Sequence, residues 1–267
     1  MSETAAARAA VAAALVAYGA ELAEQGAAQV GDAFTDLAGA DALIKESPDA
    51  FLLGVLFTQG IPAERAWAGP YLLRERLGHL DLERLATDRS AVDEAVCRAP
   101  ALHRFKHTAA GWIGDAAELL LRDWGGDASA LWADRPSAVV LTERLSGFSG
   151  IGRKKAAMAV EILVRHFGVA IDGLECGSVA YDVHVRRVFL RTGLVDVDTP
   201  ERVAAAAAEA CPRAPGSLDL PTWLVGRQWC HPKGPLCREC RMGGVCPYLV
   251  DRNVEGVGAR RSAAPPA

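Results

Sequence analysis

Four cysteines constrain the fold of this chain more than any other feature of its sequence. They lie within 17 residues, in the pattern C-x6-C-x2-C-x5-C: Cys230, Cys237, Cys240 and Cys246. Four thiolates so close in sequence can surround one metal centre without ligands from elsewhere in the chain. We therefore expect this part of the chain to fold around a metal centre.

The spacing of the four cysteines leaves two kinds of metal centre open. Structural zinc sites are usually built from two closely spaced pairs, whereas this pattern has one C-x2-C pair between two longer segments. Such unequal segments suit a [4Fe-4S] cluster, which takes four thiolates. We interpret the pattern as a [4Fe-4S] site, with zinc as the alternative and disulfides as a distant third. Cys97, Cys176 and Cys211 are scattered and are interpreted as small buried hydrophobic residues.

The composition favours a helical protein with a sizeable core. Of 267 residues, 51% are hydrophobic and only 6% aromatic, and alanine is abundant. This hydrophobic fraction excludes a wholly disordered chain, and the length fits one large domain or two small ones. The formal net charge of -4 excludes a protein that coats nucleic acid through its net charge alone.

Hydrophobic periodicity and helix-capping residues predict helices along most of the chain. Ser47 followed by Pro48 is a favoured helix start, and Thr199 followed by Pro200 is another. The predicted helices cover about 5–28, 48–60, 63–77, 91–97, 108–123, 137–146, 153–167, 201–210 and 221–229. No strand pair is evident, so the predicted fold class is all-α.

The first part of the chain has no clear feature of a membrane segment. Its apolar run, residues 9–20, is mostly alanine, and we expect it to be too short and too weakly hydrophobic to span a membrane. Acidic residues on both sides of this run also disfavour a secretory signal. We expect no membrane partner and a cytoplasmic location, where thiols stay reduced.

A glycine-rich turn between two predicted helices carries a second motif. In LSGFSGIGRKKA, residues 145–156, Gly150 and Gly152 allow backbone N–H groups to approach an anion closely. The helix that follows points the partial positive charge of its N-terminus at the same place. Its first residues are all cations: Arg153, Lys154 and Lys155. The turn is therefore predicted to bind phosphate groups.

Positive charge is concentrated in the part of the chain around this turn. Residues 144–191 contain eight Lys or Arg and four Asp or Glu, so this segment carries +4 and the remainder of the chain -8. The acidic average thus conceals a segment that favours nucleic-acid phosphates.

A third motif, YDVHVRRV at residues 181–188, begins another predicted helix. Taken alone, Asp182 fits a simple helix cap. The order of glycine turn, lysine, aspartate and four cysteines, however, resembles the helix-hairpin-helix (HhH-GPD) DNA glycosylase superfamily, and most of all its endonuclease III family. The resemblance extends loosely from about residue 48 to 248 and is carried by GIGRKKA, YDVHVRRV, GRQWC and the cysteine spacing.

The resemblance implies an all-α fold of two helical domains with a DNA-binding cleft between them. A six-helix barrel containing the helix-hairpin-helix would cover residues 48–176, and the iron–sulfur cluster domain would cover 177–250. Residues 1–47 would pack on the cluster domain. Residues 251–267 are small, polar and proline-containing, so we expect a disordered tail.

The resemblance also implies an enzyme that binds damaged double-stranded DNA and turns the damaged nucleotide out of the duplex. Lys154 would attack the sugar, while Asp182 would take a proton and stabilise positive charge on the sugar. Gln59, in LFTQG, falls where the family has the residue that fills the gap left in the duplex. The other expected DNA contacts come from the turn: Gly150, Gly152, Arg153 and Lys155.

The expected function is base-excision repair, in which a DNA glycosylase with AP lyase activity releases a base and cuts the abasic strand through a lysine Schiff base. Oxidised pyrimidines are the first expected substrates. Three alternatives remain open: Lys154 as a phosphate contact only, a monofunctional glycosylase for another lesion, and a non-catalytic iron–sulfur DNA-binding protein. We expect a monomer associated with the nucleoid.

Two departures from the family pattern bear on these expectations. Ser149 stands where the family usually has proline, a change that should leave the turn intact. Residues 169–181 look like an insertion between Lys154 and Asp182, and we expect them to border the lesion pocket. Alkylated and deaminated bases therefore stay open as substrates.

Overall fold

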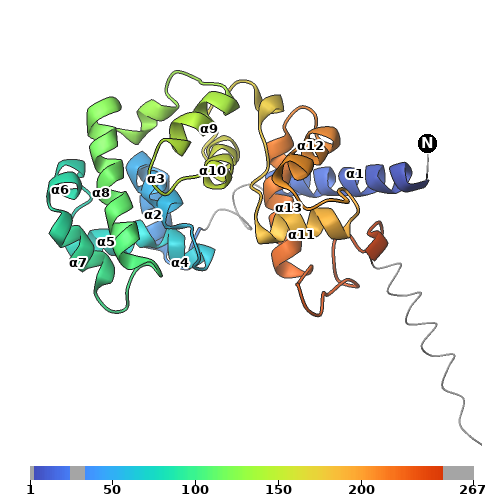
Figure 1. Ribbon diagram of the computed structural model, residues 1–267, viewed down its shortest axis with the longest axis horizontal. Helices are drawn as coiled ribbons and strands as arrows, with labels where there is room; N and C mark the ends of the chain where they lie inside the picture. The colour runs from blue at the N-terminus through green and yellow to red at the C-terminus, as the bar shows by residue number, and fades with distance from the viewer. Residues whose placement is uncertain (1–2, 25–33, 249–267) are drawn as a thin grey trace, which may run out of the picture. The chain divides into compact units, whose positions relative to one another are not determined.

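The computed structural model describes residues 3–24 and 34–248, and these residues form an all-helical fold (Figure 1). The described residues contain no named strand, only an isolated bridge between Ser137 and Asp172. The predicted all-α class is therefore confirmed. The predicted tail, 251–267, lies outside the described residues.

The chain divides into two compact units. Unit 1 consists of Met1–Glu24 and Leu174–Ala267, and unit 2 consists of Gln25–Gly173. The polypeptide thus begins in unit 1, forms all of unit 2, and returns to complete unit 1. Each unit contains a different part of the predicted site, and each is described by itself below.

Unit 2 is built around a buried helix, α3 (Pro48–Phe57). Every residue from Ala50 to Phe57 is buried, and α3 packs against α2, α4, α5 and α8. As predicted, Ser47 caps it: its hydroxyl accepts a hydrogen bond from the Ala50 amide at 3.2 Å. The other helices of the unit are α2 (Ala38–Glu46), α4 (Ala63–Trp67), α5 (Gly69–Leu77), α6 (Leu82–Thr87), α7 (Arg89–Cys97), α8 (Lys106–Asp123), the 3-10 helix η1 (Ala128–Leu131), α9 (Ala138–Ser146) and α10 (Arg153–Arg165).

Unit 1 brings the first helix of the chain together with the cysteine-containing segment. Its helices are α1 (Glu3–Glu24), the 3-10 helix η2 (Leu174–Cys176), α11 (Val183–Arg191), α12 (Pro200–Ala210), the 3-10 helix η3 (Pro215–Leu218) and α13 (Asp219–Gln228). Val11, Leu15 and Tyr18 of α1 are buried in the same hydrophobic core as Val188 and Phe189 of α11. The α1 helix is therefore part of this unit's core.

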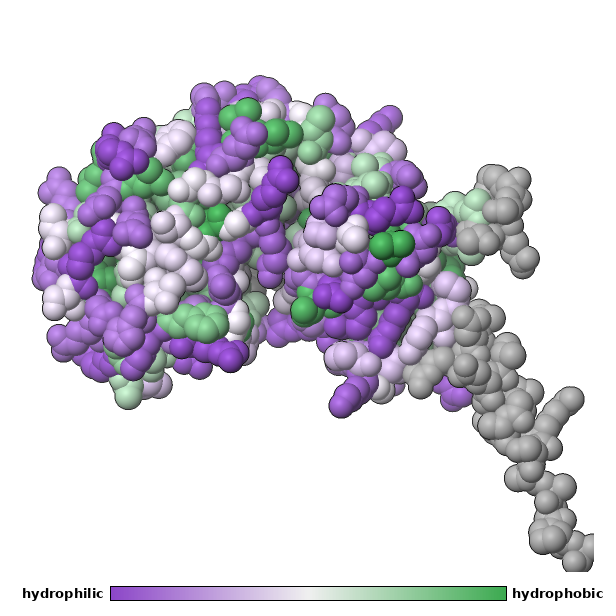
Figure 2. Space-filling model, in the orientation of Figure 1, coloured by the Kyte–Doolittle hydropathy of each residue, from purple (hydrophilic) through white to green (hydrophobic). Residues whose placement is uncertain are grey.

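The α1 helix is longer than the apolar run seen in the sequence. By length and composition alone, Ala5–Glu24 would be long enough and apolar enough to cross a membrane, contrary to the expectation for residues 9–20. Mostly buried core helices and signal sequences near the N-terminus pass the same test, and 17% of the apolar window in α1 is buried. Polar residues cover most of the face shown in Figure 2, with apolar residues scattered among them.

The observed units differ from the predicted domains at both boundaries. The segment 1–47 was expected to pack on the cluster domain, but only the part up to Glu24 belongs to unit 1. The α2 helix packs instead on α3 and α5 of unit 2. The second boundary lies between Gly173 and Leu174, inside the apparent insertion at 169–181. That segment is therefore where the chain passes from one unit to the other.

Candidate nucleic-acid interface and metal centre

The glycine turn joins α9 and α10, which pack against each other. Phe148 and Ile151 are buried, and the Ile151 amide donates to the Phe148 carbonyl at 3.0 Å. Gly150 has φ +84, and a Cβ atom at this position would lie 2.4 Å from the Trp112 ring. Gly150 is therefore required both for its backbone conformation and for the close approach of Trp112.

The N-terminus of α10 is open to an anion. Gly152 is its N-cap residue, in an extended conformation, and no side chain caps the helix. The first amides of a helix have no partner within the helix, so those of α10 remain available to a phosphate oxygen. Arg153 and Lys154 are both exposed at this helix end.

Lys155 behaves differently from its two neighbours. Its side chain is only 5% exposed, and its ammonium donates to the Leu56 carbonyl at 2.7 Å. The same nitrogen lies 5.2 Å from the centre of the Trp112 ring, within cation–π range. Burial, and next the charge of Lys154, lowers the pKa of Lys155 to about 8. The predicted phosphate contact by this ammonium does not match its position, since it points at a protein carbonyl.

The Lys155 hydrogen bond connects the hairpin to the turn that carries Gln59. Leu56 lies in the last turn of α3, where carbonyls lack helical partners. Three residues later, Gln59 is exposed, and its amide donates to the Phe57 carbonyl at 2.7 Å. Gln59 and Lys154 thus lie on two segments that are joined directly by the Lys155–Leu56 contact.

A buried histidine that the sequence did not single out lies beside this contact. His103 is 1% exposed, and its Nδ1 accepts a hydrogen bond from the Phe105 amide at 3.0 Å. Its ring packs edge-on against Phe57 and Trp112. Burial lowers the pKa of His103, and the charge of Lys155 lowers it further. A neutral imidazole is therefore favoured next to the Lys155 ammonium.

Most of the cations in residues 144–191 are bound within the protein. Arg144 pairs with Asp134 at 2.6 Å, and Arg186 pairs with Asp198. Arg187 and Arg191 donate to backbone carbonyls of the cysteine segment. Within the described parts of the chain, the exposed Arg153 and Lys154 make no such ion pair or side-chain hydrogen bond. Fewer cations of this segment are therefore available to bind phosphate than its net charge predicted.

Asp182, in unit 1, is the N-cap residue of α11. Its Oδ1 accepts hydrogen bonds from the amides of His184 and Val185, both at 2.8 Å. Because one oxygen makes both capping bonds, Oδ2 is left to interact with another partner. The capping role is therefore observed, and it does not exclude a chemical role.

The four cysteines of unit 1 line one small cavity together with apolar residues of α11 and α13. All four are free thiols. Arg191 donates to the Cys230 sulfur at 3.5 Å, and the Met242 amide donates to the Cys240 sulfur at 3.4 Å. Burial raises the pKa of Cys240 to about 11, and the other three cysteines add to this effect. Four thiolates held here need a cation to balance them, so this donor set fits a metal centre.

Helix α11 connects Asp182 to the cysteine segment. Arg187 donates to the Cys230 carbonyl at 2.6 Å, and Arg191 donates to the His231 carbonyl at 2.6 Å and the Pro232 carbonyl at 3.0 Å. The sequence indicated a DNA-facing charge for these arginines but not this role. The two arginines are four residues apart, about one helical turn, and this spacing in the sequence places both on one face of α11.

The predicted site residues therefore fall into two groups. Unit 2 contains the hairpin glycines, Lys154 and Gln59, whereas unit 1 contains Asp182 and the four cysteines. Within unit 2, the structure brings Gln59 and the hairpin together. Within unit 1, Asp182 lies at the N-terminus of α11, and an arginine farther along the same helix binds the cysteine segment.

The fold is that of the helix-hairpin-helix DNA glycosylases. A solved structure of a trapped endonuclease III–DNA covalent intermediate matches with a TM-score of 0.59 and 19% identity, covering 80% of this chain and 95% of that one. A thermostable thymine-DNA glycosylase matches with a TM-score of 0.60 and 14% identity, covering 94% of this chain and 100% of that one.

In sequence, the chain is similar to endonuclease III of Thermotoga maritima, with 30% identity over 111 residues. This match covers 41% of the chain and 47% of the relative, so the chain spans about half the length of the curated relative. No family model matches. The chain is thus similar to an endonuclease III in part of its sequence and to helix-hairpin-helix DNA glycosylases in its fold.

The buried Lys155 predicts a pH dependence of stability. Its pKa of about 8 lies below the ordinary value of 10.5, so between these pH values the unfolded chain binds a proton that the folded protein has released. The free energy of unfolding of the wild type should therefore rise relative to that of Lys155→Met as the pH increases from about 8 to 10.5. The full change is about 3 kcal/mol.

Urea unfolding of both proteins at a series of pH values measures this difference. Taking the difference between two otherwise identical chains removes the titration of all other groups. A difference that stays constant between pH 7 and 10.5 would show that Lys155 is not desolvated in the folded protein.

Proposed function

We propose that this protein is a base-excision repair DNA glycosylase with AP lyase activity, in which Lys154 is the nucleophile. The observation that carries the proposal is an exposed lysine at the uncapped N-terminus of α10, within a helix-hairpin-helix fold. An amine at this place lies beside a phosphate-binding helix end, where a DNA backbone would bring a deoxyribose close. Lys155 is a weaker candidate because its nitrogen is buried and bound to Leu56.

Damaged double-stranded DNA is the proposed partner. The open amides of α10, with Arg153 and Lys154, would bind a phosphate. The exposed Gln59 would enter the space left by the nucleotide turned out of the duplex. The hydrogen bond from Lys155 to Leu56 supports this arrangement, since it fixes the segment before Gln59 to the start of the hairpin helix.

The proposed chemistry begins with Lys154 as a neutral amine. Its nitrogen lone pair forms a bond to the sugar C1′, while the bond from C1′ to the base breaks and the base leaves with that electron pair and a proton. Loss of a proton from the nitrogen is followed by opening of the sugar ring: the C1′–O4′ bond breaks, O4′ takes a proton, and a C1′–nitrogen double bond forms, which is the Schiff base. Removal of a C2′ proton then forms a C2′–C3′ double bond and expels the 3′ phosphate, which cuts the strand.

Asp182 is proposed to accept the proton that the attacking amine loses and to stabilise positive charge on the sugar. Its capping bonds to the His184 and Val185 amides support this role, since they fix the carboxylate and occupy only Oδ1. The carboxylate can therefore act through Oδ2 without loss of the helix cap.

The metal centre is proposed to be a [4Fe-4S] cluster bound by Cys230, Cys237, Cys240 and Cys246. Zinc, with Zn–S bonds of about 2.3 Å, holds its sulfurs about 3.8 Å apart. Among the described residues, no three of these sulfurs all lie within 4.8 Å of one another, a spacing that favours a larger centre. When bound, the cluster would supply a four-point cross-link for the segment that Arg187 and Arg191 hold against α11.

An oxidised pyrimidine is the proposed base. A thymine-DNA glycosylase is among the proteins with this fold, so duplexes that carry a mismatched thymine belong in the same assay as those that carry oxidised pyrimidines. Release of the base and cleavage of the strand are measured separately for each duplex, because a monofunctional enzyme would perform only the first.

Borohydride trapping on an abasic duplex tests the nucleophile. Reduction of the Schiff base should give a covalent protein–DNA complex with the wild type and none with Lys154→Gln, because an amide cannot form the imine. Lys45→Gln, which makes the same change on α2, should trap as the wild type does. Trapping that survives in Lys154→Gln and disappears in Lys155→Met would assign the nucleophile to Lys155 instead.

Two substitutions at Asp182 separate its two roles. Asn caps a helix about as well as Asp, so Asp182→Asn should keep the free energy of unfolding within about 0.5 kcal/mol of the wild type. Base release should nevertheless slow by about 100-fold or more, since the amide cannot accept the proton. Asp182→Ala should lose about 1 kcal/mol of stability as well. Equal rates in the wild type and Asp182→Asn would leave Asp182 as a helix cap only.

Metal and sulfide analysis of the purified protein tests the cluster. We expect iron and acid-labile sulfide in equal amounts, with a brown colour. Cys240→Ser should lose most of the iron, whereas Cys211→Ser, a cysteine outside the cavity, should keep it. Zinc without iron or sulfide would contradict the assignment.

A further inference from the structure

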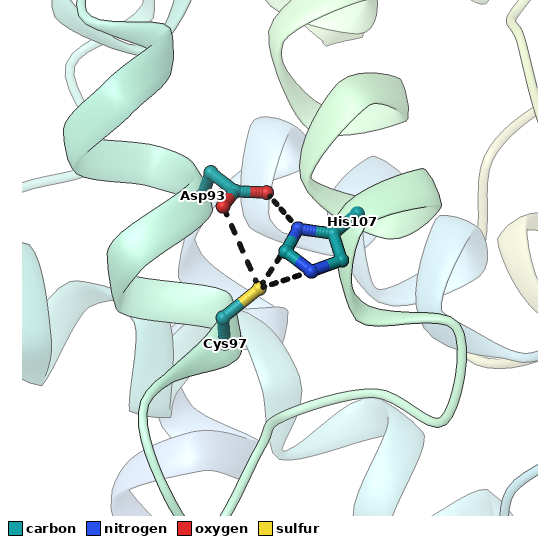
Figure 3. A group of neighbouring side chains, drawn as sticks. All are labelled: Asp93, Cys97 and His107. Atoms are coloured by element: carbon teal, nitrogen blue, oxygen red, sulfur yellow. Dashed lines mark hydrogen bonds and ion pairs between the residues drawn. The ribbon is translucent and has the colours of Figure 1, made fainter.

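A second group of metal-ligating side chains lies in unit 2, apart from the four cysteines. Asp93 and Cys97 project from α7, and His107 projects from the first turn of α8 (Figure 3). In the described parts of the chain, these residues form the one group of three or more such side chains whose donor atoms all lie within 4.8 Å of one another. Nothing in the proposed reaction uses them.

The donor atoms of the three side chains lie close together. The Cys97 sulfur lies 3.4 Å from Nδ1 of His107 and 3.7 Å from Oδ2 of Asp93. The same His107 nitrogen lies 2.8 Å from Oδ1 of Asp93. Tetrahedral zinc with ordinary bond lengths needs donor separations of about 3.3 to 3.6 Å. The sulfur–nitrogen distance lies within this range, and the sulfur–oxygen distance exceeds it by about 0.1 Å. The nitrogen contacts the other Asp93 oxygen, Oδ1, at a distance about 0.5 Å below the range, so the carboxylate must turn for one oxygen to serve as the ligand.

The side chains are free to make this adjustment, while the backbone that carries them is fixed. His107 is 69% exposed and Asp93 is 41% exposed. Arg76 donates to the carbonyls of Ala95, Arg98 and Pro100 at 2.7 to 2.9 Å, which holds the end of α7 and the loop leading to α8. A site with preformed backbone and adjustable donors binds a metal with little ordering cost.

The geometry does not suit a nucleophilic cysteine. In such a triad, the nucleophile and the carboxylate contact opposite nitrogens of the imidazole. Here the Cys97 sulfur is nearer to Nδ1, at 3.4 Å, than to Nε2, at 3.9 Å, and Asp93 contacts the same Nδ1. Sulfur and oxygen therefore both lie nearest to the same imidazole nitrogen, which is not the arrangement of a catalytic triad.

We propose that Asp93, Cys97 and His107 form a zinc-binding site that joins the end of α7 to the start of α8. One sulfur, one imidazole nitrogen and one carboxylate oxygen are a donor set that zinc accepts readily. Because His107 is largely exposed, the fourth position is open to water. On binding, the Cys97 thiol loses its proton to solvent and becomes a thiolate ligand.

Two measurements with Zn²⁺ on the full-length protein, carrying its four-cysteine metal centre, test the site. Equilibrium dialysis should show one more zinc per chain in the wild type than in Cys97→Ser, with binding to Asp93→Asn weakened at least about 100-fold. Cys176→Ser, which changes an exposed cysteine outside the group, should bind as the wild type does. Equal zinc content in the wild type and Cys97→Ser would overturn the proposal.

The second measurement is the rate of alkylation of individual cysteines, followed by mass spectrometry. Saturating zinc should slow alkylation of Cys97 at least about 10-fold in the wild type and leave it unchanged in His107→Asn. Alkylation of Cys176 in the same samples serves as the internal control. This measurement needs no variant at Cys97, so it decides the matter even if Cys97→Ser fails to fold. A Cys97 rate that does not respond to zinc in the wild type would exclude the site.

Discussion

The hydrogen bond from the Lys155 ammonium to the Leu56 carbonyl joins two helix ends that both have polar groups to satisfy. The carbonyls in the last turn of α3 have no partner within their helix, and they attract a cation through the helix dipole. A buried ammonium in turn needs an acceptor, because its desolvation is costly. The turn at Gln59, the hairpin at Gly150 and the ring of Trp112 are all organised around this one contact.

The same contact gives two adjacent lysines different surroundings. Lys155 is fixed inside unit 2, whereas Lys154 is exposed at the helix end. Neighbours on a helix point about 100° apart, so one of them can be structural while the other meets solvent. In this arrangement, the buried lysine fixes the helix end at which the exposed lysine, the proposed nucleophile, is displayed.

Much of the fold follows from local sequence signals. Ser47 and Thr199 cap the helices that they were expected to begin, and Gly150 adopts the conformation that only glycine takes easily. The helices α2 and α6 were missed. No side-chain cap marks the start of α2, and α6 has only six residues. The boundaries between the units also had no local signal, since they depend on which helices pack together.

The candidate site was harder to predict, because burial and pairing depend on tertiary contacts. Adjacent cations looked equivalent in the sequence, yet Lys155 turns inward and Arg186 pairs with Asp198. The cluster of Asp93, Cys97 and His107 was also invisible, since the sequence separates the histidine from the other two by a loop. Asp182 shows the opposite case, in which one residue satisfies the helix-cap signal and remains available for chemistry.

The division of the chain has a consequence for its synthesis. Unit 2 is continuous in sequence, so it can finish folding on the ribosome as soon as Gly173 has emerged. Unit 1 cannot, because α1 must wait for α11 to α13 to be translated before its buried face finds partners. During that interval the apolar side of α1 stays uncovered.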